Sequence, residues 1–117
     1  MGMILTGQNA TIVAGDNAQL QFTVTSDGTS SGAAVTCTAA SWAMSDRAGG
    51  TSLVTETTTG GGAVISGGSS QVITVTLSTT DTDQTPGKYY HELQVTTGSN
   101  ILTVASGTIT ILPDQAT

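Results

Sequence analysis

Residues 85–112 contain two stretches of alternating side chains joined by a short turn, and this pattern constrains the fold more than any other part of the chain. A Pro-Gly pair at 86–87 precedes the first stretch, a Gly-Ser-Asn run at 98–100 separates the two, and Pro113 follows the second. Side chains two positions apart share a face of an extended strand. One face of the first strand therefore carries Tyr89, His91, Leu93 and Val95. The pattern predicts a β-hairpin of two long strands.

The composition favours strands along the whole chain. With 117 residues, the chain has room for one domain but not for a second core. Thr occupies 24 positions and Gly 15, whereas Lys and Arg together occupy 2. Because threonine is β-branched and stiff at χ1, it suits exposed strand faces and disfavours helices. No segment shows sustained 3.6-residue periodicity, so we expect an all-β domain.

Further alternating segments precede the hairpin, each bounded by turns rich in Gly, Ser, Asp or Asn. They lie at residues 11–13, 19–25, 35–44, 53–58, 64–65 and 72–78. The segment at 53–58 is expected to be an edge strand, and residues 78–84 to close one helical turn with a Ser, Thr or Asp cap. The alternation changes phase twice, which predicts β-bulges near residues 39–40 and at Gly107.

About seven strands at this spacing predict an immunoglobulin-like antiparallel β-sandwich. We expect the sandwich to cover residues 9–113, between an N-terminal arm at 1–8 and a short tail at 114–117. The predicted structural core contains Phe22, Trp42, Tyr89, His91 and Leu93. Tyr89 stands two positions before His91, where a tyrosine corner would bind the preceding loop through its phenol hydroxyl.

The charge of the chain excludes several classes of partner. The formal net charge is −6, and Arg47 and Lys88 are the only basic side chains. Nucleic acids and anionic membranes both attract clusters of cations, so we expect the chain to bind neither. No apolar run approaches the length of a membrane span, and residues 1–7 lack the basic start of a signal peptide. We therefore expect the chain to fold in a reducing cytosol, with its acidity serving solubility.

No group of residues forms a recognisable catalytic or metal-binding motif. Cys37 is the only cysteine, and its strand pattern places it among apolar side chains, where a thiol is inert. This argument also disfavours a catalytic pair of Cys37 with His91, the only histidine, which we expect to be a core residue with a hydrogen-bonded ring. Asp81, Asp83 and Glu92 have part of the spacing of a calcium loop, but this loop would lack its glycine and its flanking helices.

The remaining polar motifs are also expected to be structural. The aspartates at 81 and 83 are interpreted as turn caps. The glycine runs at 60–62 and 67–68 lack the strand and helix context of a phosphate-binding loop. Glu56 and Glu92, the only glutamates, lie on separate predicted strands, and nothing indicates a paired acid and base. We expect no enzyme activity, no cofactor and no metal.

Three consecutive apolar residues stand in the N-terminal arm, ahead of the first predicted strand: Met3, Ile4 and Leu5. A terminus that packs against nothing is normally polar. The arm is therefore expected to be buried, either along its own sandwich or on the edge of a neighbouring subunit by strand addition.

Five runs in a fixed order resemble a known family. They are residues 14–25, 41–54, 75–82, 86–95 and 107–113. Together they resemble the small immunoglobulin-like virion domains of tailed bacteriophages, akin to the N-terminal domain of baseplate upper proteins. The resemblance covers nearly the whole chain and implies a non-enzymatic virion protein that docks other capsid or tail subunits, assembled in the host cytoplasm. Because a long C-terminal region like that of baseplate upper proteins does not follow Thr117, a small accessory subunit of the head, neck or tail fits better.

Two functional hypotheses follow. The first is a virion structural subunit that forms a homo-oligomer or symmetric array, because the near absence of Lys and Pro leaves the predicted strand edges poorly guarded. The second is a module that binds host-surface carbohydrate. Its support is a surface rich in Thr and Ser, with glycine loops at 26–32, 46–51 and 60–70; its weakness is the lack of exposed aromatic side chains.

Overall fold

The computed structural model describes residues 9–24, 35–68 and 71–114. The predicted interface residues of the arm, Met3, Ile4 and Leu5, lie outside the described residues. The same holds for the whole glycine loop at 26–32 and, apart from Asp114, for the predicted tail.

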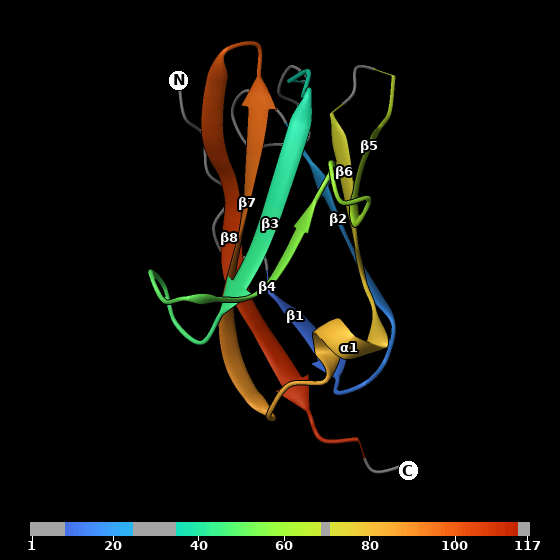
Figure 1. The fold of residues 1–117 in the computed structure, drawn as a ribbon, viewed down its shortest axis with the longest axis vertical. Coiled ribbons are helices and arrows are strands. Elements are labelled where there is room, and N and C mark those ends of the chain that lie inside the picture. The colour runs from blue at the N-terminus through green and yellow to red at the C-terminus, as the bar shows by residue number, and fades with distance from the viewer. Residues whose placement is uncertain (1–8, 25–34, 69–70, 115–117) are drawn as a thin grey trace.

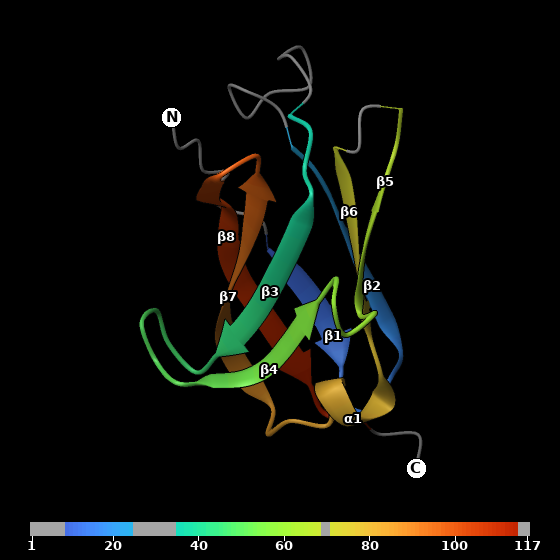
Figure 2. The ribbon, with the colours of Figure 1, turned by 45° about the horizontal axis from the view of Figure 1, so that its top comes forward.

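The described chain forms two β-sheets that face each other (Figure 1). Its elements in chain order are β1 (Ala10–Val13), β2 (Ala18–Thr23), β3 (Ala39–Ser45), β4 (Ser52–Thr57), β5 (Ala63–Ser66), β6 (Val72–Leu77), α1 (Thr79–Thr82), β7 (Gly87–Thr97) and β8 (Asn100–Leu112). One sheet has five strands in the order β1-β8-β7-β3-β4, and the other has three in the order β2-β6-β5. Figure 2 shows the five-stranded sheet on the left and the three-stranded sheet on the right. The predicted all-β sandwich is confirmed, with eight described strands rather than about seven.

Strands β7 and β8 form the long hairpin that the alternation predicts. Thr97 pairs with Asn100 across a two-residue turn. Gly98 in this turn has a φ of 61°, in the left-handed region where glycine is favoured. The tip of the hairpin therefore depends on local sequence, which is why the pattern located it correctly.

The hairpin contains a bulge, but at an earlier position than Gly107. Leu93 pairs with Ala105 and Gln94 with Thr103, which leaves Val104 as the extra residue on β8. Residues 104, 105 and 106 are all buried, because the strand changes the face that it turns to the core at this point. Gly107 itself pairs regularly with His91.

The bulge expected at residues 39–40 is absent, because β3 begins at Ala39. Val35 and Cys37 belong to the connection that precedes β3 and not to a strand, and a bend at Thr38 changes the phase of the alternation. The Thr38 N–H donates to the carbonyl oxygen of Thr96 at 2.8 Å and holds this connection against β7. The register of β3 shifts only near its end, opposite β4.

One strand pair is parallel, which corrects the expectation of an entirely antiparallel sandwich. Residues Ala10–Val13 of β1 run parallel to residues 109–112 of β8. The turn at 14–17 joins β1 to β2, and these strands belong to different sheets. The chain thus crosses between the sheets at this turn instead of forming a hairpin, and β1 runs alongside the last strand.

The helical turn expected at residues 78–84 is present as α1. The Ser78 hydroxyl accepts a hydrogen bond from the Asp81 N–H at 3.2 Å, and the Asp81 carboxylate accepts one from the Ser78 N–H at 3.0 Å. This capping box satisfies backbone donors at the start of the helix. Thr82 is buried, and its hydroxyl donates to the Asp16 carbonyl at 2.6 Å, which ties α1 to the β1–β2 turn. No helix in the described ranges is long and apolar enough to cross a membrane.

Apolar side chains from both sheets meet in a single core. Four of the five predicted core residues, Phe22, Trp42, His91 and Leu93, are buried. Tyr89 is half-buried and packs against the edge of the core. Its hydroxyl donates to the carbonyl oxygen of Thr85, the contact predicted for a tyrosine corner.

Candidate interaction surface

The two residues that could form a thiol–imidazole site are both built into the interior. Cys37 is buried, and its thiol lies 3.5 Å from the Val35 carbonyl oxygen, to which it donates. Burial raises the pKa of the Cys37 thiol, which disfavours the reactive thiolate. The Cys37 thiol and the His91 ring are therefore both buried, and each has its own hydrogen-bond partner.

His91 belongs to a buried polar pair that joins β7 to β3. The Trp42 indole Nε1–H donates to Nδ1 of His91 at 3.0 Å. The two rings have centroids 5.9 Å apart, and Phe22 from the opposite sheet lies 6.2 Å from the imidazole. A buried polar atom without a partner destabilises the folded state, so this bond makes the imidazole compatible with an apolar core.

The carboxylates with calcium-like spacing have different structural roles. Asp81 is held in the capping box and Asp83 is the C-cap residue of α1. Glu92 lies on the outer face of β7, where its carboxylate accepts a hydrogen bond from the Tyr90 hydroxyl at 3.1 Å. No group of three or more His, Cys, Asp or Glu that could hold a metal exists within residues 9–24, 35–68 and 71–114.

One carboxyl pair was not foreseen from the sequence. Hydrogen bonding with Asp81 of α1, burial and the negative charge of Asp81 raise the pKa of Glu56 on β4 to about 7. The two residues are separated by β5 and β6 in the chain, so no local motif could have revealed the pair.

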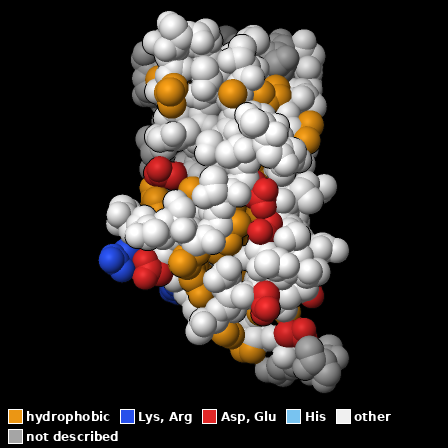
Figure 3. Space-filling model, in the orientation of Figure 1, with side chains coloured by type: hydrophobic (Ala, Val, Ile, Leu, Met, Phe, Trp, Pro, Cys, Tyr) orange, Lys and Arg blue, Asp and Glu red, His pale blue; other side chains and the backbone are white. Residues whose placement is uncertain are grey.

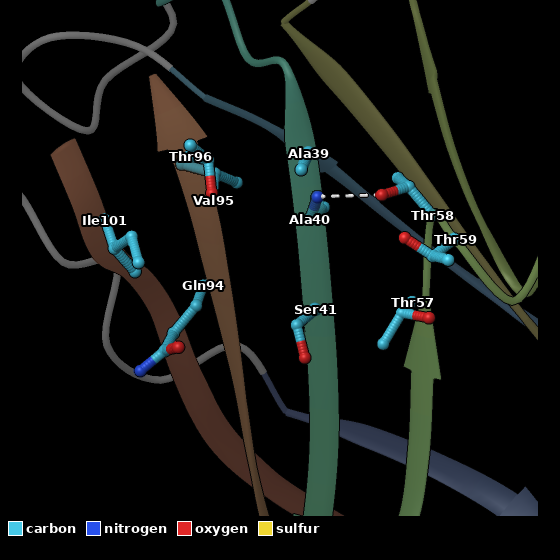
Figure 4. Close-up of a pocket in the computed structure, with 10 residues that line it drawn as sticks. All are labelled: Ala39, Ala40, Ser41, Thr57, Thr58, Thr59, Gln94, Val95, Thr96 and Ile101. Atoms are coloured by element: carbon cyan, nitrogen blue, oxygen red, sulfur yellow. Dashed lines mark hydrogen bonds between the residues drawn. The ribbon is translucent and has the colours of Figure 1, made fainter. Parts of the chain in front are cut away.

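A shallow groove crosses the outer face of the five-stranded sheet (Figure 4). Ala40, Trp42 and Met44 turn inward on β3, so the small side chains of Ala39 and Ser41 form the outer floor. The walls come from β7 and β8 on one side and from the end of β4 on the other: Gln94, Thr96 and Ile101, and Thr57, Thr58 and Thr59. All residues that line the groove are uncharged.

Charge is absent from one end of the described molecule. Three long segments, 35–45, 57–80 and 93–113, contain no Asp, Glu, Lys, Arg or His. Figure 3 shows the acidic and basic side chains in the middle and lower parts of this face and none at the upper end. The upper end holds the tip of the β7–β8 hairpin and parts of β3, β5 and β6 (Figure 1).

Four strands lie at sheet edges: β1 and β4 in one sheet and β2 and β5 in the other. Glu56 is the only charged side chain in these four strands, and none of them contains proline. Strand β1 pairs only with residues 109–112 of β8, and the Thr108 N–H donates to the Asn9 side chain at 2.9 Å. Residues 100–107 of β8 therefore have β7 as their one partner strand among the described residues. Large apolar side chains are exposed at these places: Leu53 on β4, Val64 on β5 and Ile101 on β8.

Comparisons with known proteins address the fold. No protein-family model matches the chain, and no curated protein sequence matches it. Among solved structures, it is similar to CopC from Methylosinus trichosporium OB3b, at 15% identity over 95% of this chain and 90% of that one, with a TM-score of 0.52. It is also similar to a chicken TCR, at 10% identity over 91% of this chain and 53% of that one, with a TM-score of 0.58.

The fold is an immunoglobulin-like β-sandwich. At these sequence identities, the two structural similarities support the fold of this chain and give no information about its activity. The resemblance of the sequence to virion domains of tailed bacteriophages stays a prediction.

Proposed function

We propose that this protein is a non-enzymatic structural subunit of a bacteriophage virion, which docks other virion proteins and further copies of itself through its sheet edges. The observation that carries the proposal is the lack of protection on those edges. Soluble β-proteins usually guard edge strands with Lys, Pro or inward charges, because unpaired N–H and C=O groups otherwise recruit another strand. Here the edge strands β1, β2, β4 and β5 carry one charge and no proline.

The charge distribution supports the same function. Copies that each carry a net charge of −6 repel one another, so they associate best through surfaces without carboxylates. The described residues at the end that holds the β7–β8 tip have this property, and they include Val64 and Ile101, which are 53% and 70% exposed. Such side chains gain free energy when a neighbouring subunit covers them.

The order of the five sequence runs that resemble phage virion domains supplies the finer part of the proposal. It favours an accessory subunit of the head, as decoration or head fibre, or of the neck, tail or baseplate. Positions on the head and on the tail have equal support.

Two measurements test the proposal. Sedimentation of the purified chain is expected to show a homo-oligomer, and quantitative mass spectrometry of particles of the encoding phage is expected to find the chain at a symmetric copy number. A stable monomer that is absent from purified particles would refute it. Deletion of residues 1–6 then tests the predicted arm. If the arm is an assembly element, the truncated protein folds normally but no longer joins the oligomer or the particle. If the arm belongs to the domain's own core, the truncated protein is less stable, and its folded fraction still assembles.

The carbohydrate-binding alternative has one observation in its favour, the groove lined by Ser41, Thr57 and Gln94, whose hydroxyl and amide groups can bind sugar hydroxyls. It has less support than docking, because Trp42 is buried and offers no face for a sugar to stack on. Binding of the isolated protein to a glycan array, abolished by Gln94→Ala, would favour this alternative.

A further inference from the structure

Strand β5 is an edge strand whose backbone pairs on one side only. Its one partner strand among residues 9–24, 35–68 and 71–114 is β6. Immediately before β5, the Gly62 carbonyl oxygen accepts a hydrogen bond from the Thr76 N–H of β6 at 2.8 Å. Residues that exchange hydrogen bonds alternate along an antiparallel ladder with residues that do not. Counted from Gly62, the backbone groups of Val64 turn toward β6, whereas those of Ala63 and Ile65 turn toward the open edge.

The outward backbone groups of β5 are complementary to those of a second β5. A two-fold axis at Val64 places Ala63 of one copy opposite Ile65 of the other, on both sides of the axis. In each of these pairs both residues turn their N–H and C=O groups to the edge, so they can exchange both of their hydrogen bonds. The two Val64 side chains then lie directly opposite each other, in a pair without hydrogen bonds, where side chains approach most closely.

The side chains of β5 suit this arrangement on both faces of the sheet. Val64 is exposed on the outer face, and the opposite Val64 of a second copy would cover it. On the inner face, Ala63 is buried and Ile65 is half-buried against the core. A second β5 would therefore continue the apolar inner face and remove an isolated apolar side chain from the outer one. Both ribbon views show β5 at the right margin of the upper half of the molecule (Figures 1 and 2).

Charge favours β5 over the other edge strands as the place where two copies meet. Copies with a net charge of −6 repel each other, so a contact between them needs an edge without carboxylates. Residues 57–80, which include all of β5 and β6, contain no charged side chain. By contrast, β4 contains Glu56, and Asp16 lies in the turn between β1 and β2.

The antiparallel direction also keeps the nearby carboxylates apart. The Glu56 carboxyl group lies against Gly62, at the start of β5, where a Cβ atom would overlap it. In a parallel pair of β5 strands, the two Glu56 side chains would stand at the same end. In the antiparallel pair they stand at opposite ends, each near the uncharged Ser66 of the other copy.

We propose that two copies of this chain associate through β5, in an antiparallel pair with its two-fold axis at Val64, so that their three-stranded sheets form one continuous sheet. This inference rests on the proposed function, in which copies dock through their sheet edges, and it specifies the edge, the partner and the register.

Disulfide capture tests this register. Val64→Cys in the full chain, treated with oxidised glutathione, is expected to give a disulfide-linked dimer, because the opposed Cβ atoms come within reach of a disulfide. Ser66→Cys is the matched control, since Ser66 is exposed on the same face of β5 but lies opposite Gly62 of the other copy. We expect it to form about tenfold less dimer, because its thiols are not held together. The wild type is the blank, since its only cysteine, Cys37, is buried.

Sedimentation of the same variants separates this inference from the proposed function. Circular dichroism first checks that each variant is folded. Equal capture of Val64→Cys and Ser66→Cys would overturn the register. An oligomer in which Val64→Cys is not captured would overturn the β5 interface and leave docking through another edge intact. Capture at residue 64 by a chain that is absent from virions would support the β5 interface and refute the virion role.

Discussion

The interior of the sandwich and its edge strands follow opposite rules. In the interior, polar groups bond specific partners: the Trp42 indole donates to His91, and the buried Thr82 hydroxyl donates to the Asp16 carbonyl. In the described edge strands, polar and apolar side chains alternate, and Glu56 is the one charged residue. The comparison teaches that the described core contains specific polar pairs, whereas the described edge strands carry little charge that would oppose pairing with another strand.

The largest effect is expected at Leu93, which is fully buried opposite Trp42 in the register of β3 and β7. Leu93→Ala removes apolar contacts and leaves a cavity, so the free energy of unfolding is expected to fall by about 3 kcal/mol. Urea denaturation measures this change. The next residue, Gln94, is exposed on the same strand, and Gln94→Ala is expected to stay within about 0.5 kcal/mol of the wild type. Equal losses at the two positions would contradict the core assignment.

The buried polar pair is expected to give the next largest effect. Trp42→Phe removes the indole donor to His91 and part of the core volume, with an expected loss of about 2 kcal/mol. A double-mutant cycle with His91→Leu isolates the bond, with an expected coupling of about 1 kcal/mol. Circular dichroism is the readout, since Trp42 is the only tryptophan and its fluorescence is lost in the variant. Additive losses would mean that the two rings pack together without a significant bond.

The Tyr89 hydroxyl is expected to contribute less, because it lies at the boundary between interior and surface. Tyr89→Phe removes its hydrogen bond to the Thr85 carbonyl and is expected to lower the free energy of unfolding by about 1 kcal/mol. Tyr90→Phe is the matched control, since its hydroxyl bonds Glu92 on the outer face. A larger loss for Tyr90→Phe than for Tyr89→Phe would refute a tyrosine corner.

The smallest effect on stability, and the largest on assembly, is expected at an edge. Val64→Lys on β5 places a charge on an exposed edge position, so the free energy of unfolding is expected to change by about 0.5 kcal/mol or less. The same substitution is expected to lower the oligomer fraction in sedimentation, because a lysine guards an edge against pairing. Thr76→Lys adds the same charge to the exposed face of β6, a central strand without a free edge. If both variants weaken association equally, the charge and not the edge is responsible.

The parts of the fold that could be predicted from sequence are those decided within a few residues. Alternation in β7, the Gly98 turn and the Ser78 cap depend on neighbours in the chain, and each prediction is confirmed. The sequence shows the two phase changes, but a phase change indicates only a range of residues within which a bulge or bend must lie. Val104 carries the bulge in place of Gly107 because the register of β7 against β8 decides which residue remains unpaired.

The amino-acid sequence by itself determined the all-β class, most of the strand segments and the inward parity of Trp42, His91 and Leu93, because a period of two reports directly on the faces of a strand. Only the tertiary structure decided that β1 runs parallel to β8 and which strands stand at the edges. Each of these depends on how segments far apart in the chain are brought together. The alternation within one segment does not show which distant segment it pairs with, so these pairings are seen only in the folded structure.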